Sequence, residues 1–196
     1  MQTMKARAFC TAFLLAFLVL FTPAANAANW IDSADVSWYK EGQSRFVIST
    51  ETQLAGLIKL TGEGNGFKDK TIILSGDLNL EGKEWTPIGT EANPFRGTFD
   101  GRGHLIGLNA PLFNFAKAAA ICGVNLSGDI LIRAGNGFQL SSLVNNCTDT
   151  TIRDCSFTGS LVADSSLEEE VYLGGLVGIY RGEGSEVSGC RVRARL

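Results

Sequence analysis

From Phe67 onward, apolar residues occur in short runs separated by glycine, asparagine, aspartate and serine. The runs include TIIL, LNL, HLIGL, LVNN and YLGGLVGIY. Runs of this length are typical of β-strands, and the residues between them favour tight turns. The helical spacing of apolar residues is lost in this part of the sequence, so the pattern predicts an all-β domain.

Three segments of the chain share one frame of apolar positions. A leucine opens each copy, at Leu112, Leu143 and Leu176, so the copies are 31 and 33 residues apart. The third copy carries a two-residue insertion near RGEG. Self-similarity at such a period predicts a solenoid. The other matched positions are Ile121, Ile152 and Val187; Val124, Cys155 and Cys190; Leu126, Phe157 and Val192; and Gly128 with Gly159.

The last part of each repeat alternates between apolar and polar residues, as a strand with one inward face does. The absence of an amphipathic helix between the copies argues against helical solenoids and leucine-rich horseshoes. We therefore predict a right-handed parallel β-helix in which equivalent side chains stack about 4.8 Å apart in an interior column. Its opening coils span residues 67–110 and its three repeats residues 111–196.

Residues 28–66 precede the solenoid and have a different pattern. Aromatic and β-branched residues flank the polar segment KEGQS, which predicts a short N-terminal hairpin or two edge strands. The following segment, STETQLAGLIKL, predicts an α-helix with Thr50 and Gln53 in a capping box. Three glycines in TGEGNG end this helix. Its apolar stripe consists of Leu54, Leu57, Ile58 and Leu60.

The stretch EWTPIGTEANPFRGTFDGRGHLI (84–106) is dense in glycine, proline and aromatic residues, and it contains the single histidine of the chain. Asp100 and His104 are the first candidates for acid–base catalysis. However, no serine or cysteine nucleophile has a clear place beside them, and FDGRGH is typical of tight turns. We therefore predict that Asp100 binds backbone amides and His104 caps a coil corner formed with Gly101 and Gly103. The expected interior residues are Trp85, Ile88, Phe95, Phe99, Leu105 and Ile106.

The first residues have the pattern of an export signal. Lys5 and Arg7 precede the apolar run 8–21, and Ala25-Asn26-Ala27 is a small-x-small cleavage pattern. The run is short of the approximately 20 residues that a transmembrane helix needs. A cleaved signal peptide of residues 1–27 is expected, with an uncleaved N-terminal anchor as the alternative. The protein would then be exported to the cell surface, the periplasm or the extracellular space.

Four cysteines follow the predicted signal: Cys122, Cys147, Cys155 and Cys190. Export permits their oxidation, and four cysteines allow three pairings. Cys155 and Cys190 share one register, which favours a stacked ladder of free thiols over a disulfide. One histidine and the absence of C-x-x-C spacing predict no metal and no cofactor. The net charge of −3, without a basic patch rich in aromatics, predicts no nucleic-acid partner.

The chain from residue 30 onward resembles the GLUG-repeat family of exported bacterial surface proteins. The Gly-Leu-hydrophobic-Gly core of that family is present as GGLVG at Gly174–Gly178, where the first two repeats have APLFN and SSLVN. The segments DKTIILSGDLNLEGKEWTPIGT and FRGTFDGRGHLIGL resemble blocks that introduce such repeats, including in some IgA-specific metallo-endopeptidases. The resemblance implies a β-helix whose first coil is covered by the N-terminal helix. It does not imply protease activity, because the zinc motif H-E-x-x-H is absent.

These observations favour a non-enzymatic, exported surface module that binds a glycan or a host matrix protein. A carbohydrate-active β-helix lyase or hydrolase is the alternative, but such enzymes need clustered carboxylates. Another alternative is a stalk or fragment of a larger surface protease or adhesin. The sequence stops at CRVRARL within a repeat strand, so we expect self-association through an uncapped C-terminal coil. The scattered carboxylates are Asp77, Asp100, Asp129, Asp149, Asp154, Asp164 and the run Leu167–Glu170.

Overall fold

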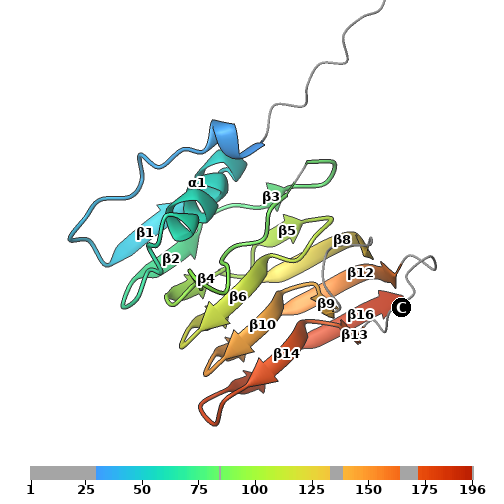
Figure 1. Cartoon of the computed structure of the whole chain (residues 1–196). Coiled ribbons are helices and arrows are strands. Elements are labelled where there is room, and N and C mark those ends of the chain that lie inside the picture. The colour runs from blue at the N-terminus through green and yellow to red at the C-terminus, as the bar shows by residue number, and fades with distance from the viewer. Residues whose placement is uncertain (1–29, 84, 133–138, 164–171, 196) are drawn as a thin grey trace, which may run out of the picture.

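The computed structural model describes residues 30–83, 85–132, 139–163 and 172–195. Its strands stack into a solenoid, whose coils follow one another in Figure 1 from the N-terminal helix to the C-terminal strands. The prediction of an all-β parallel β-helix is confirmed. The predicted signal peptide (1–27) and the acidic run Leu167–Glu170 lie outside the described residues.

Three main sheets form the walls of the solenoid, and all of their ladders are parallel. The first has the order β1 (Arg45–Ile48), β2 (Thr71–Leu74), β4 (Thr98–Asp100), β7 (Ala120–Cys122), β11 (Thr151–Arg153) and β15 (Glu186–Ser188). The second has the order β14 (Val177–Arg181), β10 (Val144–Thr148) and β6 (Phe113–Lys117). The third has the order β16 (Arg191–Arg195), β12 (Ser156–Ala163), β8 (Asn125–Ile132), β5 (Leu105–Gly107) and β3 (Leu78–Asn79). A short fourth sheet pairs β13 (Tyr172–Gly174) with β9 (Gln139–Ser141).

The three repeats pair in the register that the sequence predicts. Ile152 on β11 lies beside Ile121 on one side and Val187 on the other. In the third sheet, Phe157 lies in the same way between Leu126 and Val192. Each repeat is therefore one coil, and equivalent residues of successive coils stack in columns.

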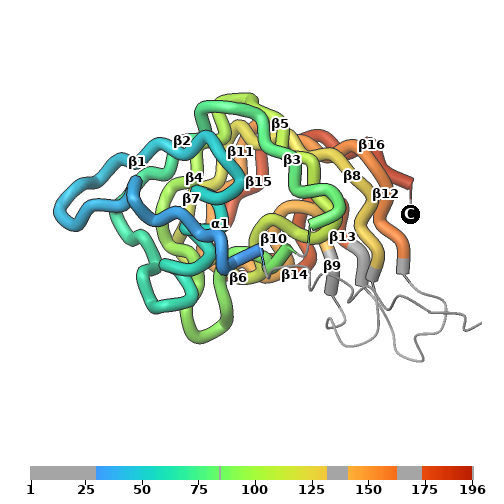
Figure 2. Tube along the Cα trace, turned by 90° about the horizontal axis from the view of Figure 1, so that it is seen from above, coloured from blue at the N-terminus to red at the C-terminus, as the bar shows by residue number. Residues whose placement is uncertain are grey.

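Apolar side chains fill the interior of the coils. Figure 2, which looks along the stack, shows the coils superposed around this interior. Aromatic rings connect one coil to the next, with centroids 6.2 Å apart between Phe67 and Phe95 and 5.2 Å apart between Phe95 and Phe113. Phe99 meets Phe113 edge-on at 5.5 Å. Such tilted and edge-on pairs are favourable arrangements of aromatic rings.

The two-residue insertion of the third repeat lies at a corner between two strands. In the second repeat, only Asp149 and Thr150 separate β10 from β11, whereas residues 182–185 separate β14 from β15. The longer corner leaves the registers on both sides unchanged. The amide of Thr150 donates to the Ser185 hydroxyl at 3.1 Å, and this hydroxyl donates to the carbonyl of Arg181 at 2.7 Å. A side chain thus supplies the acceptor for Thr150 at this corner.

The predicted helix forms as α1 (Glu51–Gly62) and lies over the first coil (Figure 1). Thr50 is its N-cap and accepts from the amide of Gln53 at 3.2 Å. The Gln53 side chain reaches one residue further back than in a standard capping box and accepts from the amide of Ser49 at 2.8 Å. Among the described residues, no helix has both the length and the apolar character needed to cross a bilayer. The buried apolar residues of α1 include Leu54, Leu57 and Ile58.

The predicted N-terminal hairpin is wrong, whereas the alternative of an edge strand holds for one of the two segments. Residues Trp30–Ser33 form a short 3-10 helix, η1. The second segment forms β1, which pairs in parallel with β2, so that Phe46 lies beside Ile72. Phe46 and Ile48 are buried and Val47 is exposed, so this alternation matches the one-sided sheet of the solenoid.

The opening stretch supplies interior residues as predicted, with one exception. Trp85, Ile88, Phe95, Phe99 and Ile106 are buried, but Leu105 is exposed. Leu105 and Ile106 are neighbours on β5 and therefore point to opposite faces of the sheet. Ile106 is in register with Leu126 and takes the inward position.

The coil register yields a prediction about stability. Ile152 is fully buried, whereas its partner Val187 in the next coil is 46% exposed. Ile152→Ala should lower the free energy of unfolding by about 2–5 kcal/mol because it leaves a cavity between two coils. The matched control Val187→Ala should cost less than about 1 kcal/mol, because half of that side chain already contacts water. Urea titration measures both, and equal losses would contradict the stacked interior.

Candidate functional site

The corner between β4 and β5 holds the residues that the sequence singled out. Asp100 ends β4, and its carboxylate accepts from the amide of Arg102 at 3.1 Å and from the Nε of Arg102 at 2.7 Å. The amide of His104 donates to the carbonyl of Gly101 at 2.8 Å, which closes the turn. The carboxylate of Asp100 is thus engaged within its own turn.

Glycine has a specific role at two positions of this corner. A Cβ on Gly101 would lie 2.5 Å from the carbonyl oxygen of Gly123 in the next coil, so only glycine permits this close approach. Gly103 has φ of +79°, in the left-handed region that favours glycine. Both glycines therefore serve the geometry of the turn.

The His104 side chain points to a different partner from Asp100. Its Nδ1 lies 3.1 Å from Oδ1 of Asp77, in the loop between β2 and β3. The amide of Leu105 donates to the same carboxylate oxygen at 2.9 Å. The structure therefore connects His104 to the preceding coil through Asp77 and does not join it to Asp100 by a hydrogen bond.

The Asp77 carboxyl is electrostatically distinct because of these contacts. The hydrogen bond from the Leu105 amide, followed by that of His104, holds the pKa of Asp77 below its ordinary value. The Leu105 amide donates to the carboxylate and so favours its charged form, and the hydrogen bond with His104 acts in the same direction. The Asp77–His104 pair is an inter-coil contact at the surface, where the Asp77 side chain is mostly exposed.

Two of the cysteines, Cys155 and Cys190, occupy equivalent positions in adjacent coils. Cys155 and Cys190 each direct Sγ to the carbonyl two residues earlier, at 3.2 Å from Arg153 and 3.3 Å from Ser188. All four described cysteines are free thiols. Burial raises the pKa of Cys155 to about 12 and that of Cys147 to about 11. These thiols are therefore protonated near neutral pH and are poor nucleophiles.

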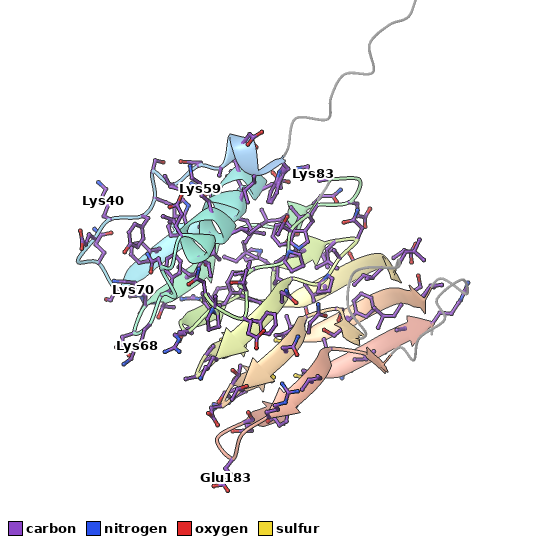
Figure 3. All side chains as sticks on the ribbon, in the orientation of Figure 1. Lys40, Lys59, Lys68, Lys70, Lys83 and Glu183 are labelled. Carbon is purple, nitrogen blue, oxygen red and sulfur yellow. The ribbon has the colours of Figure 1, made fainter. Side chains whose placement is uncertain are left out.

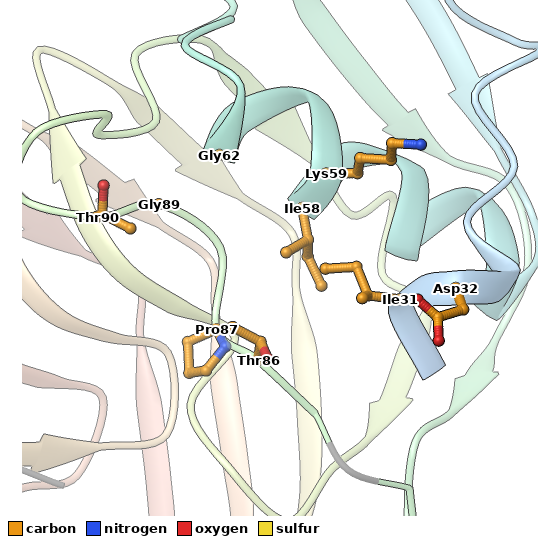
Figure 4. Close-up of a pocket in the computed structure, with 9 residues that line it drawn as sticks. All are labelled: Ile31, Asp32, Ile58, Lys59, Gly62, Thr86, Pro87, Gly89 and Thr90. Atoms are coloured by element: carbon orange, nitrogen blue, oxygen red, sulfur yellow. The ribbon is translucent and has the colours of Figure 1, made fainter. Parts of the chain in front are cut away.

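The described residues also contain a hollow that the sequence did not predict, between the N-terminal cap and the opening coil (Figure 4). Its volume is about 530 Å³. Ile31 of η1 and Ile58 of α1 point toward each other in Figure 4, with Pro87 below them. The hollow is lined by Ile31, Asp32, Ile58, Lys59, Gly62, Thr86, Pro87, Gly89 and Thr90.

Three segments far apart in sequence position the lining of this hollow. The rings of Trp30 and Trp85 pack at 5.1 Å between centroids, which holds η1 against the opening coil. Asn93 fixes the other side, because its Nδ2 donates to the carbonyl of Gly62 at 2.8 Å. The amide of Asn93 donates to the Thr90 hydroxyl at 3.0 Å, so the hydroxyl hydrogen of Thr90 can donate elsewhere. Because the lining comes from three separate segments, no single sequence motif identifies this site.

Side chains of both charges and apolar side chains line the hollow. Lys59 supplies a cation from the last turn of α1, and Asp32 supplies a carboxylate from η1. Thr86 and Thr90 add hydroxyl groups. A concave apolar surface with a few polar groups is the usual composition of a small-ligand site. Within the described part of the chain, no three histidine, cysteine, aspartate or glutamate side chains cluster as metal ligands.

The Asp77 contacts predict a pH-dependent contribution to stability. Asp77→Ala should lower the melting temperature at pH 7, because it removes the acceptor for Leu105 and His104. Since the folded-state pKa of Asp77 is lowered, this contribution is present above the unfolded-state pKa and is lost as the pH falls through the folded-state pKa. The difference in melting temperature between the wild type and this variant should therefore shrink from about pH 5 to about pH 2.

The control for this experiment is Glu41→Ala, which changes an exposed carboxylate in the turn before β1. This variant should leave the melting temperature unchanged at every pH. A deficit of Asp77→Ala that is equally large at pH 2 and pH 7 would show that the charge of Asp77 has no role.

The cysteine geometry predicts four free thiols in protein purified without reductant. In denaturant, Cys122, Cys147, Cys155 and Cys190 should all react with Ellman's reagent. In the native protein at pH 8, Cys147 and Cys155 should react much more slowly, because their burial and raised pKa keep them protonated. The loss of two reactive thiols in the denatured sample would instead reveal a disulfide.

Comparison of the chain with protein-family models, with curated proteins and with solved structures finds no match.

Proposed function

We propose that the protein is an exported, non-enzymatic surface module that binds a glycan carrying a carboxylate, with the hollow between the cap and the opening coil as its contact site. The observation that carries this proposal is the composition of the hollow, whose lining combines apolar side chains with hydroxyls, a cation and a carboxylate. A sugar ring has a matching division, with an apolar face of C–H groups and polar hydroxyls at its edge.

Each part of the lining has a role in this proposal. Ile31, Ile58 and Pro87 pack under the ring face, and the hydroxyls of Thr86 and Thr90 bind ring hydroxyls. Lys59 pairs with the carboxylate of the glycan. Asp32 accepts from hydroxyl groups of the glycan.

The membership of the GLUG-repeat family is part of the same proposal, and the packing of the GGLVG segment supports it. A Cβ on Gly178 would lie 2.7 Å from the carbonyl oxygen of Asn145 in the preceding coil. A Cβ on Gly175 would lie 2.9 Å from the Val192 side chain. The motif glycines therefore stand where adjacent segments approach too closely for a side chain. The proposed export rests on the N-terminal sequence pattern, with the cell surface, the periplasm or the extracellular space as the destination.

A glycan array, followed by titration calorimetry on the best ligand, tests this function. Lys59→Gln should weaken binding of an acidic glycan by about two- to five-fold, as expected for an exposed ion pair, and the loss should shrink at high salt. The matched control is Lys68→Gln, an exposed lysine that does not line the hollow and that lies apart from Lys59 in Figure 3. This control should bind as the wild type does.

A turnover assay on the same glycans separates the alternatives. Release of soluble oligosaccharides would identify a carbohydrate-active enzyme and overturn the proposal. Binding that is equally weakened by Lys59→Gln and Lys68→Gln would place the contact outside the hollow. If the protein binds no glycan but binds a host matrix protein, an adhesin of another specificity is favoured. If it binds neither, a stalk is favoured.

A further inference from the structure

The outer face of the third sheet carries side chains of opposite charge in a fixed order. Its strands β3, β5, β8, β12 and β16 follow one another along the solenoid (Figure 1). Alternate residues of these strands point outward, and the register places them in columns that run from strand to strand. One column comprises Asn79, Gly107, Ser127, Thr158 and Arg193, and a neighbouring column comprises Leu105, Asn125, Ser156 and Arg191.

The β3 end of these columns is acidic. A recess of about 310 Å³ lies there, and its lining includes Glu51, Asp77 and Glu81. A Cβ on Gly107 would lie 3.4 Å from Oε1 of Glu81, so this carboxylate stands over a position that has no side chain. Glu81 is exposed, and the ion pairs of the described residues do not include it.

The β16 end of the columns is basic. Val192 is in register with the buried Phe157 and faces the interior, so Arg191 and Arg193 on either side of it point outward. Both arginines are exposed, and in the part of the chain that the structure describes neither forms an ion pair. Three strand spacings of about 4.8 Å separate β16 from β5, which is too far for Arg193 to reach Glu81 within one copy.

We propose that this face packs against the same face of a second copy of this chain in a two-fold dimer. The axis lies within the contact, parallel to the strands and between β8 and β12. This rotation reverses the order of the strands, so that β16 of one copy lies over β5 of the other and β12 lies over β8. Arg193 then meets Glu81 of the second copy, and the symmetry forms this pair twice.

The neighbouring column adds a second pair of opposite charges. Arg191 lies over Leu105 of the other copy, and the Asp77 carboxylate is bound to the amide of Leu105 at 2.9 Å. The contacts of Asp77 with His104 and with Leu105 both use Oδ1, so Oδ2 is available to the guanidinium of Arg191. Leu105 is 42% exposed, and the methylene groups of the arginine cover it.

The middle of the face fits the same rotation. Leu131 is 45% exposed and Val162 is 42% exposed, and each covers the other across the contact, which removes apolar surface from water. Asp129 faces a serine and not the aspartate of the other copy, so no carboxylates meet there. The facing pairs of β8 and β12 are Ser127 with Thr158, Asp129 with Ser160, and Leu131 with Val162.

The order of the charges disfavours the other two-fold packing of these faces. An axis parallel to the columns would place β16 over β16 and one acidic recess over the other. Like charges that face each other in this way are destabilising. The face is therefore complementary to itself in one orientation.

The size of the face sets the expected strength of the dimer. Five strands at about 4.8 Å and strands of up to about 26 Å give at most roughly 600 Å² for each copy. Stable complexes usually bury about 800 Å² for each partner. We therefore expect a weak, reversible dimer.

Sedimentation velocity over a range of concentrations tests this dimer on the full chain, expressed with its N-terminal segment and purified from the compartment that it reaches. The wild type should form a dimer whose dissociation constant rises with salt. Arg193→Glu and Glu81→Arg should each raise this constant by about two- to 30-fold, because a like-charge contact replaces an exposed ion pair at two symmetric places.

A mixture of the two single variants provides a sharper test. In the mixed dimer both contacts again join opposite charges, so the mixture should dimerise about as well as the wild type, although neither variant does so alone. The double variant restores the same pairs and should behave likewise. Arg45→Glu and Glu41→Arg are matched controls at exposed positions outside this face, and they should leave the dimer unchanged.

A chain that stays monomeric at the highest concentration measured would overturn the proposal, as would a dimer that the two charge reversals do not weaken. A mixture of the variants that dimerises no better than either variant alone would show that Arg193 and Glu81 do not meet across the contact. Polymers that keep growing with concentration would also contradict it, because a two-fold contact closes at two copies.

Discussion

Hydrogen bonding between adjacent coils is the interaction on which this structure depends. A short parallel strand cannot satisfy its own backbone groups, so each strand relies on the strands of the coils before and after it. Ile152 illustrates the consequence, because its burial requires Ile121 on one side and Val187 on the other. Strands of three to eight residues suffice along the three repeats because the ladder is continuous.

The same dependence explains why the first coil needs a cover. Trp38 stacks on Phe67 at 6.1 Å between centroids and donates its Nε1 hydrogen to the carbonyl of Gln53 at 3.1 Å. The amide of Asp35 donates to the carbonyl of Thr52 at 2.9 Å. The irregular segment before β1 is thus fixed to α1 and to the aromatic interior together. Sealing the first coil also creates the hollow beside Ile31 and Ile58, so the candidate site is a product of the capping arrangement.

The sequence predicts the repeated part of the fold well because each coil repeats the same local pattern. The register of Leu126, Phe157 and Val192 follows from alignment alone, since equivalent residues of a solenoid must stack. The hairpin prediction was wrong for a physical reason. The partner of β1 is a parallel strand that follows α1, and two parallel strands are not joined by a tight turn that the sequence could reveal. The prediction that Leu105 is buried was wrong because the sequence does not show which of two adjacent apolar residues faces inward.

The candidate site was less accessible to sequence reasoning. Asp100 and His104 attracted attention by residue type, yet their contacts lead to Arg102 and to Asp77, respectively. The lining of the hollow comes from η1, α1 and residues 86–90, which share no motif. The density of WTPIGT in glycine, proline and aromatic residues marked an unusual turn, but its apposition to Ile31 depends on tertiary packing between Trp30 and Trp85.

The corner at Ser185 has a consequence for how such a chain can change its length. Two extra residues lie between β14 and β15, and the amide of Thr150 donates to the Ser185 hydroxyl of this longer bend. The register of the strands is therefore the same on both sides of the bend, whereas the number of residues in the bend differs between repeats. A gene encoding this fold can gain or lose codons at a bend without shifting any downstream residue from the inside to the outside. Repeats can thus differ in length at a bend while their strands keep the same register.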